Sequence, residues 1–110
     1  MTTLEKVRKL ERYLAIRSPD AEAVIDQTID KLLDREKARL LEIQATLSSQ
    51  LGEFEKRYNM TTADFCVRFQ RGELGDDMDY IEWSATSDML KSTEKHLLLL
   101  EEEIGNEPVH

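Results

Sequence analysis

Apolar residues along this chain recur at steps of three and four, which is the period of an amphipathic helix. In residues 3–17 the repeated positions are Leu4, Val7, Leu10, Tyr13 and Leu14. They predict a short helix with Thr3 as its N-cap. Pro19 disfavours helical geometry at Ser18 and suits the first position of a following helix. We therefore expect a turn there, with Ser18 as the cap of the next helix.

The second predicted helix covers residues 19–58, because no strong breaker interrupts the pattern and the periodicity continues across Gly52. Its apolar positions are Ile25, Ile29, Leu32, Leu33, Leu40, Ile43, Leu47, Leu51, Phe54 and Tyr58. This near-heptad spacing makes a narrow seam for a partner helix. A helix of this length rises about 60 Å, so we expect an elongated molecule.

Two more helices follow. Asn59 suits a left-handed helix end, and Thr61 with Asp64 three residues later resembles a capping box, which predicts a short helix over residues 62–71 that ends at Gly72. A fourth helix is predicted over about residues 79–104. Residues 1–110 are thus expected to form a single all-α domain.

The fourth helix is long enough to return antiparallel along the second as a helical hairpin. Within it, the segment "HLLLLEEE" places four leucines around the whole circumference of the helix, so they cannot all face one neighbour. We expect a homodimer that forms a four-helix-type bundle. The predicted dimer interface comprises Leu40, Ile43, Leu47, Leu97, Leu98 and Leu100.

Composition agrees with an all-α class, since 110 residues contain only four Gly and two Pro. No apolar run approaches the ~20 residues that cross a bilayer, so no membrane association is expected. The single cysteine, Cys66, cannot form an internal disulfide and fits a reducing compartment. We predict a cytoplasmic protein.

The net charge of −8 is unevenly distributed. Residues 1–17 hold five Lys or Arg and two Glu, whereas residues 73–110 hold two Lys and eleven Asp or Glu. An anionic surface repels nucleic acid and attracts basic proteins. We expect no nucleic-acid binding at physiological ionic strength, and a basic protein as a possible partner.

Few residues suggest catalysis. His96 and His110 lie in no recognisable metal or nucleophile spacing. Cys66 lies between Phe65 and Phe69 without a neighbouring base that would mark a reactive thiol, and it is interpreted as a small buried residue. The sequence contains no phosphate-binding glycine loop, zinc spacing or nucleophile elbow. We predict a protein that is not an enzyme and has no cofactor or metal.

The segment "GELGDDMDYIEW", residues 72–83, holds five carboxylates: Glu73, Asp76, Asp77, Asp79 and Glu82. It does not follow the calcium-loop pattern, because its glycine precedes the aspartates. A capping role fits better, with Asp79 as the cap of the fourth helix and Glu82 closing a capping box. The remaining charge suggests an anionic surface for a partner's Lys or Arg. The predicted partner-binding residues are Glu73, Asp76, Asp77, Tyr80 and Trp83, although packing in the helix junction is the favoured role of the two aromatic residues.

The string "FEKRYNMTTADFCVRFQRGELGDDMDYIEW" resembles a motif of small, uncharacterised prokaryotic helical proteins. The matching positions are Phe54, Tyr58, Met60, Thr61, Phe65, Phe69, Gly72–Asp76, Asp79, Tyr80, Glu82 and Trp83. Some of these proteins look like antitoxin components, so the resemblance implies a basic, toxin-like partner. Many antitoxins also carry a DNA-binding fold, and none is identified in this sequence.

Two hypotheses follow. The first is a non-enzymatic protein-interaction module, antitoxin-like, that neutralises a basic partner through its acidic surface. The alternative is a structural homodimer in which the acidic turn serves folding only.

Overall fold

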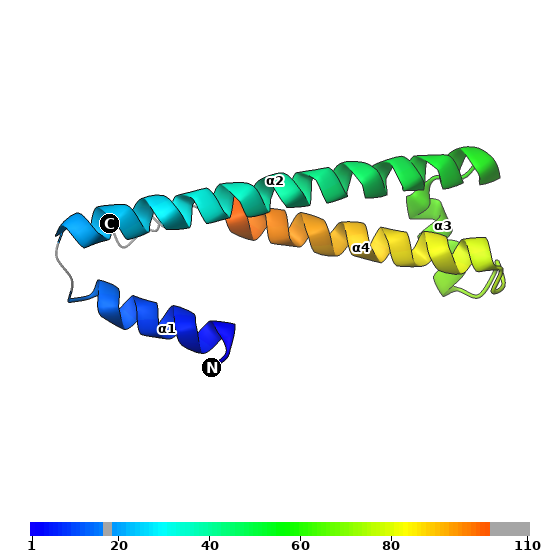
Figure 1. The fold of residues 1–110 in the computed structure, drawn as a ribbon. Helices are drawn as coiled ribbons and strands as arrows, with labels where there is room; N and C mark the ends of the chain where they lie inside the picture. Colours follow the sequence, from blue (N-terminus) through cyan, green and yellow to red (C-terminus); the bar gives the residue numbers. More distant parts are fainter. Residues whose placement is uncertain (17–18, 102–110) are drawn as a thin grey trace, which may run out of the picture. The chain divides into compact units, whose positions relative to one another are not determined.

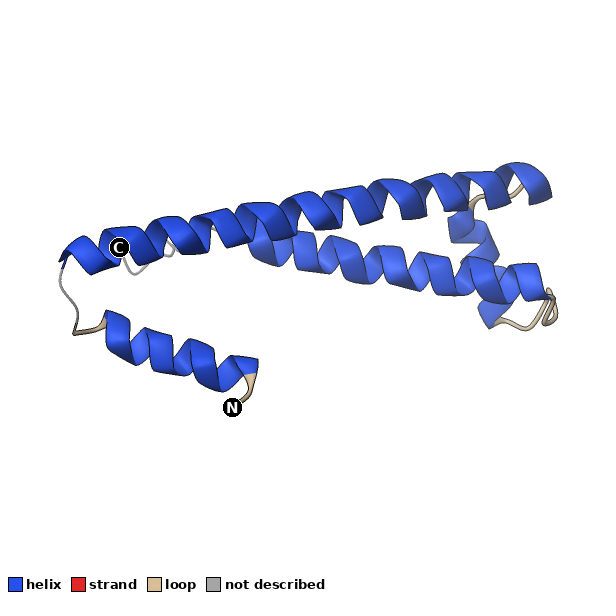
Figure 2. Cartoon of the chain, viewed as in Figure 1, coloured by secondary structure: helices blue, strands red, loops and turns tan. Residues whose placement is uncertain are grey.

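A computed structural model describes the backbone of residues 1–16 and 19–101, and the side chains of residues 1–16 and 22–101. Within these residues the chain is all-helical: α1 (Thr3–Leu14), α2 (Pro19–Tyr58), α3 (Thr62–Gln70) and α4 (Met78–Glu101). Figure 2 shows the helices and the loops that join them. The all-α class and the 40-residue second helix are confirmed.

The first helix begins one residue earlier than its predicted cap implied. Thr2, not Thr3, is the N-cap of α1, and its hydroxyl accepts the Glu5 N–H while the Glu5 carboxylate accepts the Thr2 N–H. This reciprocal capping box satisfies two donors that a helix start leaves open. The regular helix ends at Leu14, short of the predicted residue 17. The predicted cap at Ser18 and the predicted end of the fourth helix at residue 104 lie outside the described residues.

The α2–α3 joint is built from local hydrogen bonds. Asn59 has a φ of 50°, so it takes the predicted left-handed conformation, and the following Met60 N–H donates back to the Glu55 carbonyl. Thr61 caps α3 by accepting the Asp64 N–H at 3.1 Å. The Glu55 side chain accepts the Thr62 N–H at 2.8 Å, which ties the end of α2 to the start of α3.

The predicted stop at Gly72 is also confirmed. Gly72 has a φ of 73°, its N–H donates to the Phe69 carbonyl, and the Glu73 N–H donates to the Arg68 carbonyl. These two bonds form a Schellman motif, which closes a helix where glycine adopts the left-handed conformation at little cost. The chain then turns through residues 73–77 into α4.

The chain divides into two compact units, Met1–Arg35 and Glu36–His110. In the second unit α2 and α4 form an antiparallel hairpin. Arg57 near the end of α2 meets Asp79 at the start of α4, whereas Lys37 far back along α2 approaches Glu101 at the last described turn of α4. Figure 1 shows these two helices side by side, with α3 across their joined ends.

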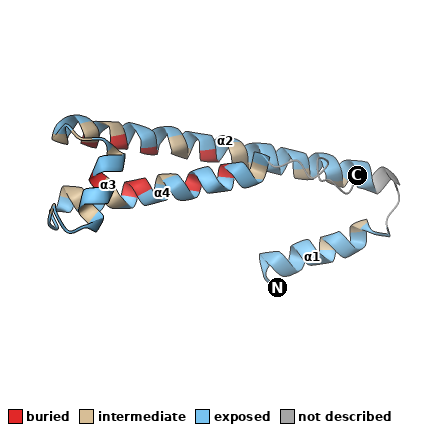
Figure 3. Cartoon of the chain, turned by 180° about the vertical axis from the view of Figure 1, so that it is seen from behind, coloured by how far each residue is buried: buried red, intermediate tan, exposed pale blue. Residues whose placement is uncertain are grey.

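The core of the second unit lies between the hairpin helices and under α3. Phe65 and Trp83 have no exposed surface, and Leu51 and Phe54 pack with them. Figure 3 shows that buried positions continue along the facing sides of α2 and α4. In an antiparallel hairpin of this kind, burial of Val-, Leu- or Phe-sized side chains stabilises by about 1.5–3 kcal/mol each.

This core changes the interpretation of the predicted dimer interface. Leu40, Leu47 and Leu97 are buried within the single chain, and Ile43 and Leu100 are half-buried. These side chains therefore pack largely within the hairpin of a single chain. Leu98, by contrast, is 65% exposed, as expected for one member of a run of leucines that surrounds the helix.

The described residues of the first unit contain no buried side chain. Leu10, Leu14, Ile25 and Ile29 are half-buried, and its other large apolar residues are exposed. In this unit the amphipathic pattern predicts the helices correctly, but the described residues form no buried core.

Candidate functional site

The acidic turn lies at the closed end of the hairpin, where α3 leads into α4. The side chains of Glu73, Asp76 and Asp77 are exposed there. Gly75, with a φ of 80°, supplies the second left-handed residue of the turn. The turn is held at one end by the Schellman motif of α3 and at the other by the cap of α4, so its backbone is fixed on both sides.

Asp77 is the cap of α4, which corrects the prediction for Asp79. The Asp77 carboxylate accepts the Asp79 N–H at 2.9 Å, and its carbonyl accepts the N–H groups of Tyr80 and Ile81. Helix α4 consequently begins at Met78, one residue before the expected start. The predicted capping box between Asp79 and Glu82 is not formed.

Asp79 instead joins α4 to the end of α2. Its carboxylate accepts a hydrogen bond from the Tyr58 hydroxyl and an ion-paired hydrogen bond of 2.8 Å from the Arg57 guanidinium. These two donors hold the pKa of Asp79 below its usual value, the Tyr58 hydrogen bond being the larger cause. The same carboxylate raises the pKa of both Tyr58 and Arg57.

Glu73 has cationic neighbours within its own chain. Its two carboxylate oxygens lie 3.8 Å from Arg68 Nε and 3.9 Å from Arg71 Nη1. Exposed pairs at these distances contribute little stability, typically below about 1 kcal/mol. They nevertheless compensate the charge of Glu73, which leaves Asp76 as the carboxylate of the turn with no hydrogen bond or ion pair in the described part of the chain.

The two aromatic residues of the predicted partner site pack inward. Trp83 stacks on Phe65 with ring centroids 4.0 Å apart, and its indole N–H donates to the Thr62 hydroxyl at 3.0 Å. Tyr80 is half-buried, and its ring contacts those of Tyr58 and Phe65. A fully buried Trp83 offers no surface to a partner, so its role is to fix the junction, as the favoured interpretation of the sequence had it.

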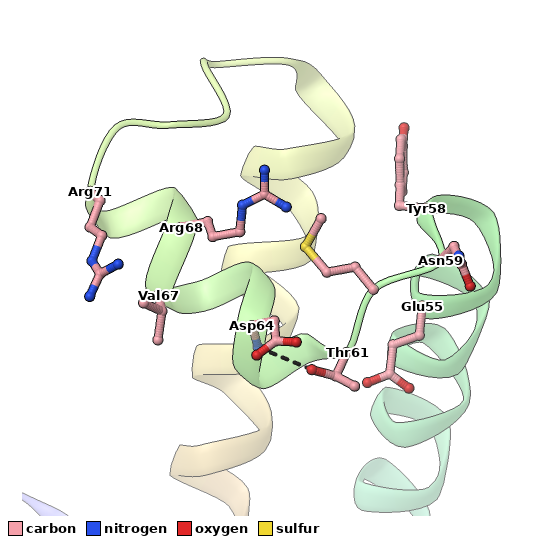
Figure 4. Close-up of a pocket in the computed structure, with 9 residues that line it drawn as sticks. Glu55, Tyr58, Asn59, Thr61, Asp64, Val67, Arg68 and Arg71 are labelled. Atoms are coloured by element: carbon pink, nitrogen blue, oxygen red, sulfur yellow. Dashed lines mark hydrogen bonds between the residues drawn. The ribbon is translucent and has the colours of Figure 1, made fainter.

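A groove of about 790 Å³ lies beside the junction, between the end of α2 and α3. Figure 4 shows Arg68 and Arg71 on one side of it and Glu55 on the other, with the hydrogen bond between Thr61 and Asp64 below. Its lining carries charges of both signs, and Glu55 is already committed to the Thr62 N–H. The groove therefore lacks the charge bias that would select an anion or a cation.

We find no further candidate for a chemical site among the described residues at this end of the hairpin. In the residues that the structure describes, no group of three or more His, Cys, Asp or Glu side chains could hold a metal ion. The Cys66 thiol is half-buried and lies 3.5 Å from the Ser87 hydroxyl. None of the described helices has both the length and the hydropathy needed to cross a bilayer.

Comparison of the chain with protein-family models, with curated proteins and with solved structures gave no match. The site is therefore defined by its own geometry. The sequence located the turn and its carboxylates, but it did not reveal the hydrogen bonds that Arg57, Tyr58 and Thr62 make at the junction. Their partners Asp79 and Trp83 lie 21 or 22 residues away, and no local pattern links such positions.

Proposed function

We propose that this chain is a non-enzymatic protein-interaction module that binds a basic partner protein through the acidic turn. The observation that carries the proposal is the exposure of Asp76 and Asp77 on a turn whose backbone is fixed at both ends. Asp76 has no partner in the described part of its own chain. An exposed carboxylate on a fixed backbone can accept hydrogen bonds from Lys or Arg, and the backbone adds no further ordering cost on binding.

The partner surface is smaller than the sequence suggested. Glu73 contributes a charge that Arg68 and Arg71 partly compensate, and Trp83 contributes only the frame beneath the turn. The motif resemblance suggests that the basic partner is a small, toxin-like protein. Neutralisation would then consist of occupying its cationic surface.

The test is the double substitution Asp76→Asn with Asp77→Asn. Asparagine caps helices as well as aspartate does, so the variant removes two charges while the α4 cap is retained. We expect binding of a defined Arg- and Lys-rich peptide, measured by calorimetry, to weaken severalfold at low ionic strength. The difference should shrink as salt screens the exposed charges.

The matched control is Asp88→Asn with Glu94→Gln. Both residues are exposed on α4, so this variant has the same net charge but an intact turn. The control should bind nearly as well as wild type. Equal weakening in the two variants would mean that net charge alone attracts the peptide, and an unchanged affinity of the turn variant would refute the proposal.

We also propose that the chain self-associates. The support is the first unit, in which no described apolar side chain is buried and most are exposed. Self-association is compatible with the interaction module, since a dimer would present two acidic turns. Self-association alone, without a basic partner, is what the alternative function of a structural homodimer requires.

A further inference from the structure

The carboxylates around the acidic turn differ in how far their own chain already engages them. Asp79 is closed to a partner, because the Tyr58 hydroxyl and the Arg57 guanidinium both donate hydrogen bonds to it. Asp76, at the other extreme, has no hydrogen bond or ion pair in the described part of the chain. Glu73 is intermediate, since two guanidinium groups approach its carboxylate at distances too long for a hydrogen bond.

The contact of Glu73 with these two guanidinium groups follows from the way α3 ends. Arg68 lies in the last turn of α3, and Arg71 is its C-cap residue. The Glu73 N–H donates to the Arg68 carbonyl at 3.0 Å, a bond of the Schellman motif that returns the chain over this last turn. One carboxylate oxygen of Glu73 consequently lies 3.8 Å from Arg68 Nε and the other 3.9 Å from Arg71 Nη1.

These ion pairs are weak enough for a partner to replace them. The side chains of Arg68, Arg71 and Glu73 are 48%, 70% and 45% exposed. Exposed ion pairs add little to stability, and salt screens them. A cationic group of a partner can form the short, charge-assisted hydrogen bonds with Glu73 that the two arginines do not form. It must first displace both arginines, whose positive charges also repel it.

We propose that Arg68 and Arg71 are an autoinhibitory pair, which competes with a basic partner for Glu73 and lowers the affinity of the acidic turn. This inference rests on the proposed binding of a basic partner and names two residues that regulate it. Asp76 gives the partner a first contact without a competitor, and Glu73 becomes available when the arginines move away. Both arginines line the groove beside α3, which gives their side chains room to leave the turn (Figure 4).

The test is the double substitution Arg68→Gln with Arg71→Gln in the full-length chain. Binding of the defined Arg- and Lys-rich peptide is measured by calorimetry at low ionic strength. We expect its dissociation constant to fall about two- to fivefold. The matched control, Lys91→Gln with Lys95→Gln, removes two positive charges from exposed positions of α4 and leaves the ion pairs of Glu73 intact. Its dissociation constant should stay close to that of wild type.

The substitution Glu73→Gln identifies the carboxylate for which the arginines compete. It should weaken peptide binding more in the chain that lacks both arginines than in the wild-type chain, and it should remove most of the gain in affinity. An unchanged affinity of the arginine variant would overturn the proposal. An equal gain in the lysine variant, or a gain that persists after Glu73→Gln, would also overturn it, because net charge alone would then explain the binding.

Circular dichroism of each variant separates a change in binding from a change in folding. If the double arginine variant loses helix, Arg71→Gln alone replaces it, since this side chain is 70% exposed and lies beyond the last residue of α3. The single variant should give a smaller gain of the same sign, and no gain would overturn the proposal.

Failure of this proposal and failure of the basic-partner proposal give different results. If Asp76→Asn with Asp77→Asn weakens binding while the arginine variant binds as wild type does, only the autoinhibitory role is wrong. If neither the wild-type chain nor the arginine variant binds the peptide, the acidic turn is not a site for a basic partner, and both proposals are wrong.

Discussion

The two units of this chain use similar amphipathic helices with opposite results. In Glu36–His110 the apolar faces meet, and Trp83 and Phe65 are fully buried beneath α3. In Met1–Arg35 the described helices have faces of the same kind, and none of the described side chains is buried. A periodic pattern therefore specifies a helix and its apolar face, but a core also requires a second face brought against the first.

What brings the faces together in the second unit is the chemistry of its joints. The left-handed residues Asn59 and Gly72 end two helices, and Glu55 and Asp77 secure the starts of the next two. Hydrogen bonds across the hairpin, from Tyr58 and Arg57 to Asp79, then help to fix the register of α4 on α2. In the first unit the hydrogen bonds of Thr2 with Glu5 and of Thr28 with the Val24 carbonyl join residues only three or four positions apart.

The largest expected effect comes from removing the central ring of the core. Trp83→Ala should lower the free energy of unfolding by about 3–5 kcal/mol, because it opens a cavity between Phe54 and Phe65 and leaves Thr62 without its indole partner. Denaturant unfolding followed by circular dichroism measures this change.

The corresponding truncation in the first unit is Leu4→Ala, at a residue that is exposed. At a concentration where the chain is monomeric, it should change the free energy of unfolding by no more than about 0.5 kcal/mol. Comparable losses of unfolding free energy from the two truncations would show that the first unit has a core of its own. The contrast between the two units would then be wrong.

Two glycines give effects smaller than that of Trp83→Ala, and of opposite sign at the two sites. A methyl group added at either Gly52 or Gly72 would meet no atom within 4 Å, so backbone conformation alone decides the outcome. Gly52→Ala lies inside α2 and should stabilise by about 0.5–1 kcal/mol, because alanine loses less conformational freedom in a helix. Gly72→Ala forces a side chain into the left-handed region at the Schellman motif and should destabilise by about 1 kcal/mol.

The thermal unfolding midpoints of these two variants are the measurement. A midpoint that falls for both would mean that Gly52 has a role in bending or packing α2 that its open surroundings do not reveal. A midpoint unchanged by Gly72→Ala would mean that the turn does not depend on its left-handed residue, and the description of the acidic turn as a fixed frame would then be wrong.

The sequence predicted the helices to within a few residues wherever a local signal marks the boundary. Pro19, Thr61 and Gly72 act on their immediate neighbours, so the bounds of α2 and α3 could be predicted from the sequence. The choice between Asp77 and Asp79 as the cap of α4 could not be predicted from the sequence. Both are acceptable caps, and the outcome depends on Arg57 and Tyr58, which reach Asp79 only after the chain has folded back.

The last prediction concerns acid stability, and it tests that long-range contact directly. The pKa of Asp79 is lower in the folded chain than its usual value near 3.9, because Tyr58 and Arg57 stabilise its charged form. A lowered folded pKa contributes stability above the unfolded value, and this stability is lost as the pH falls through the folded value. Asp79→Asn should therefore be less stable than wild type at pH 7, and the difference should disappear once the pH has fallen below the lowered folded pKa of Asp79.

Unfolding measured across pH 7 to 2 distinguishes this contact from a general effect of charge. Asp76→Asn removes a charge of the same turn that has no partner in the described residues, so its stability should follow wild type throughout the range. If Asp76→Asn reproduced the behaviour of Asp79→Asn, the pH dependence would reflect the net charge of the turn. If only Asp79→Asn shows it, the contact of Asp79 with Tyr58 and Arg57 holds the hairpin of the second unit in register.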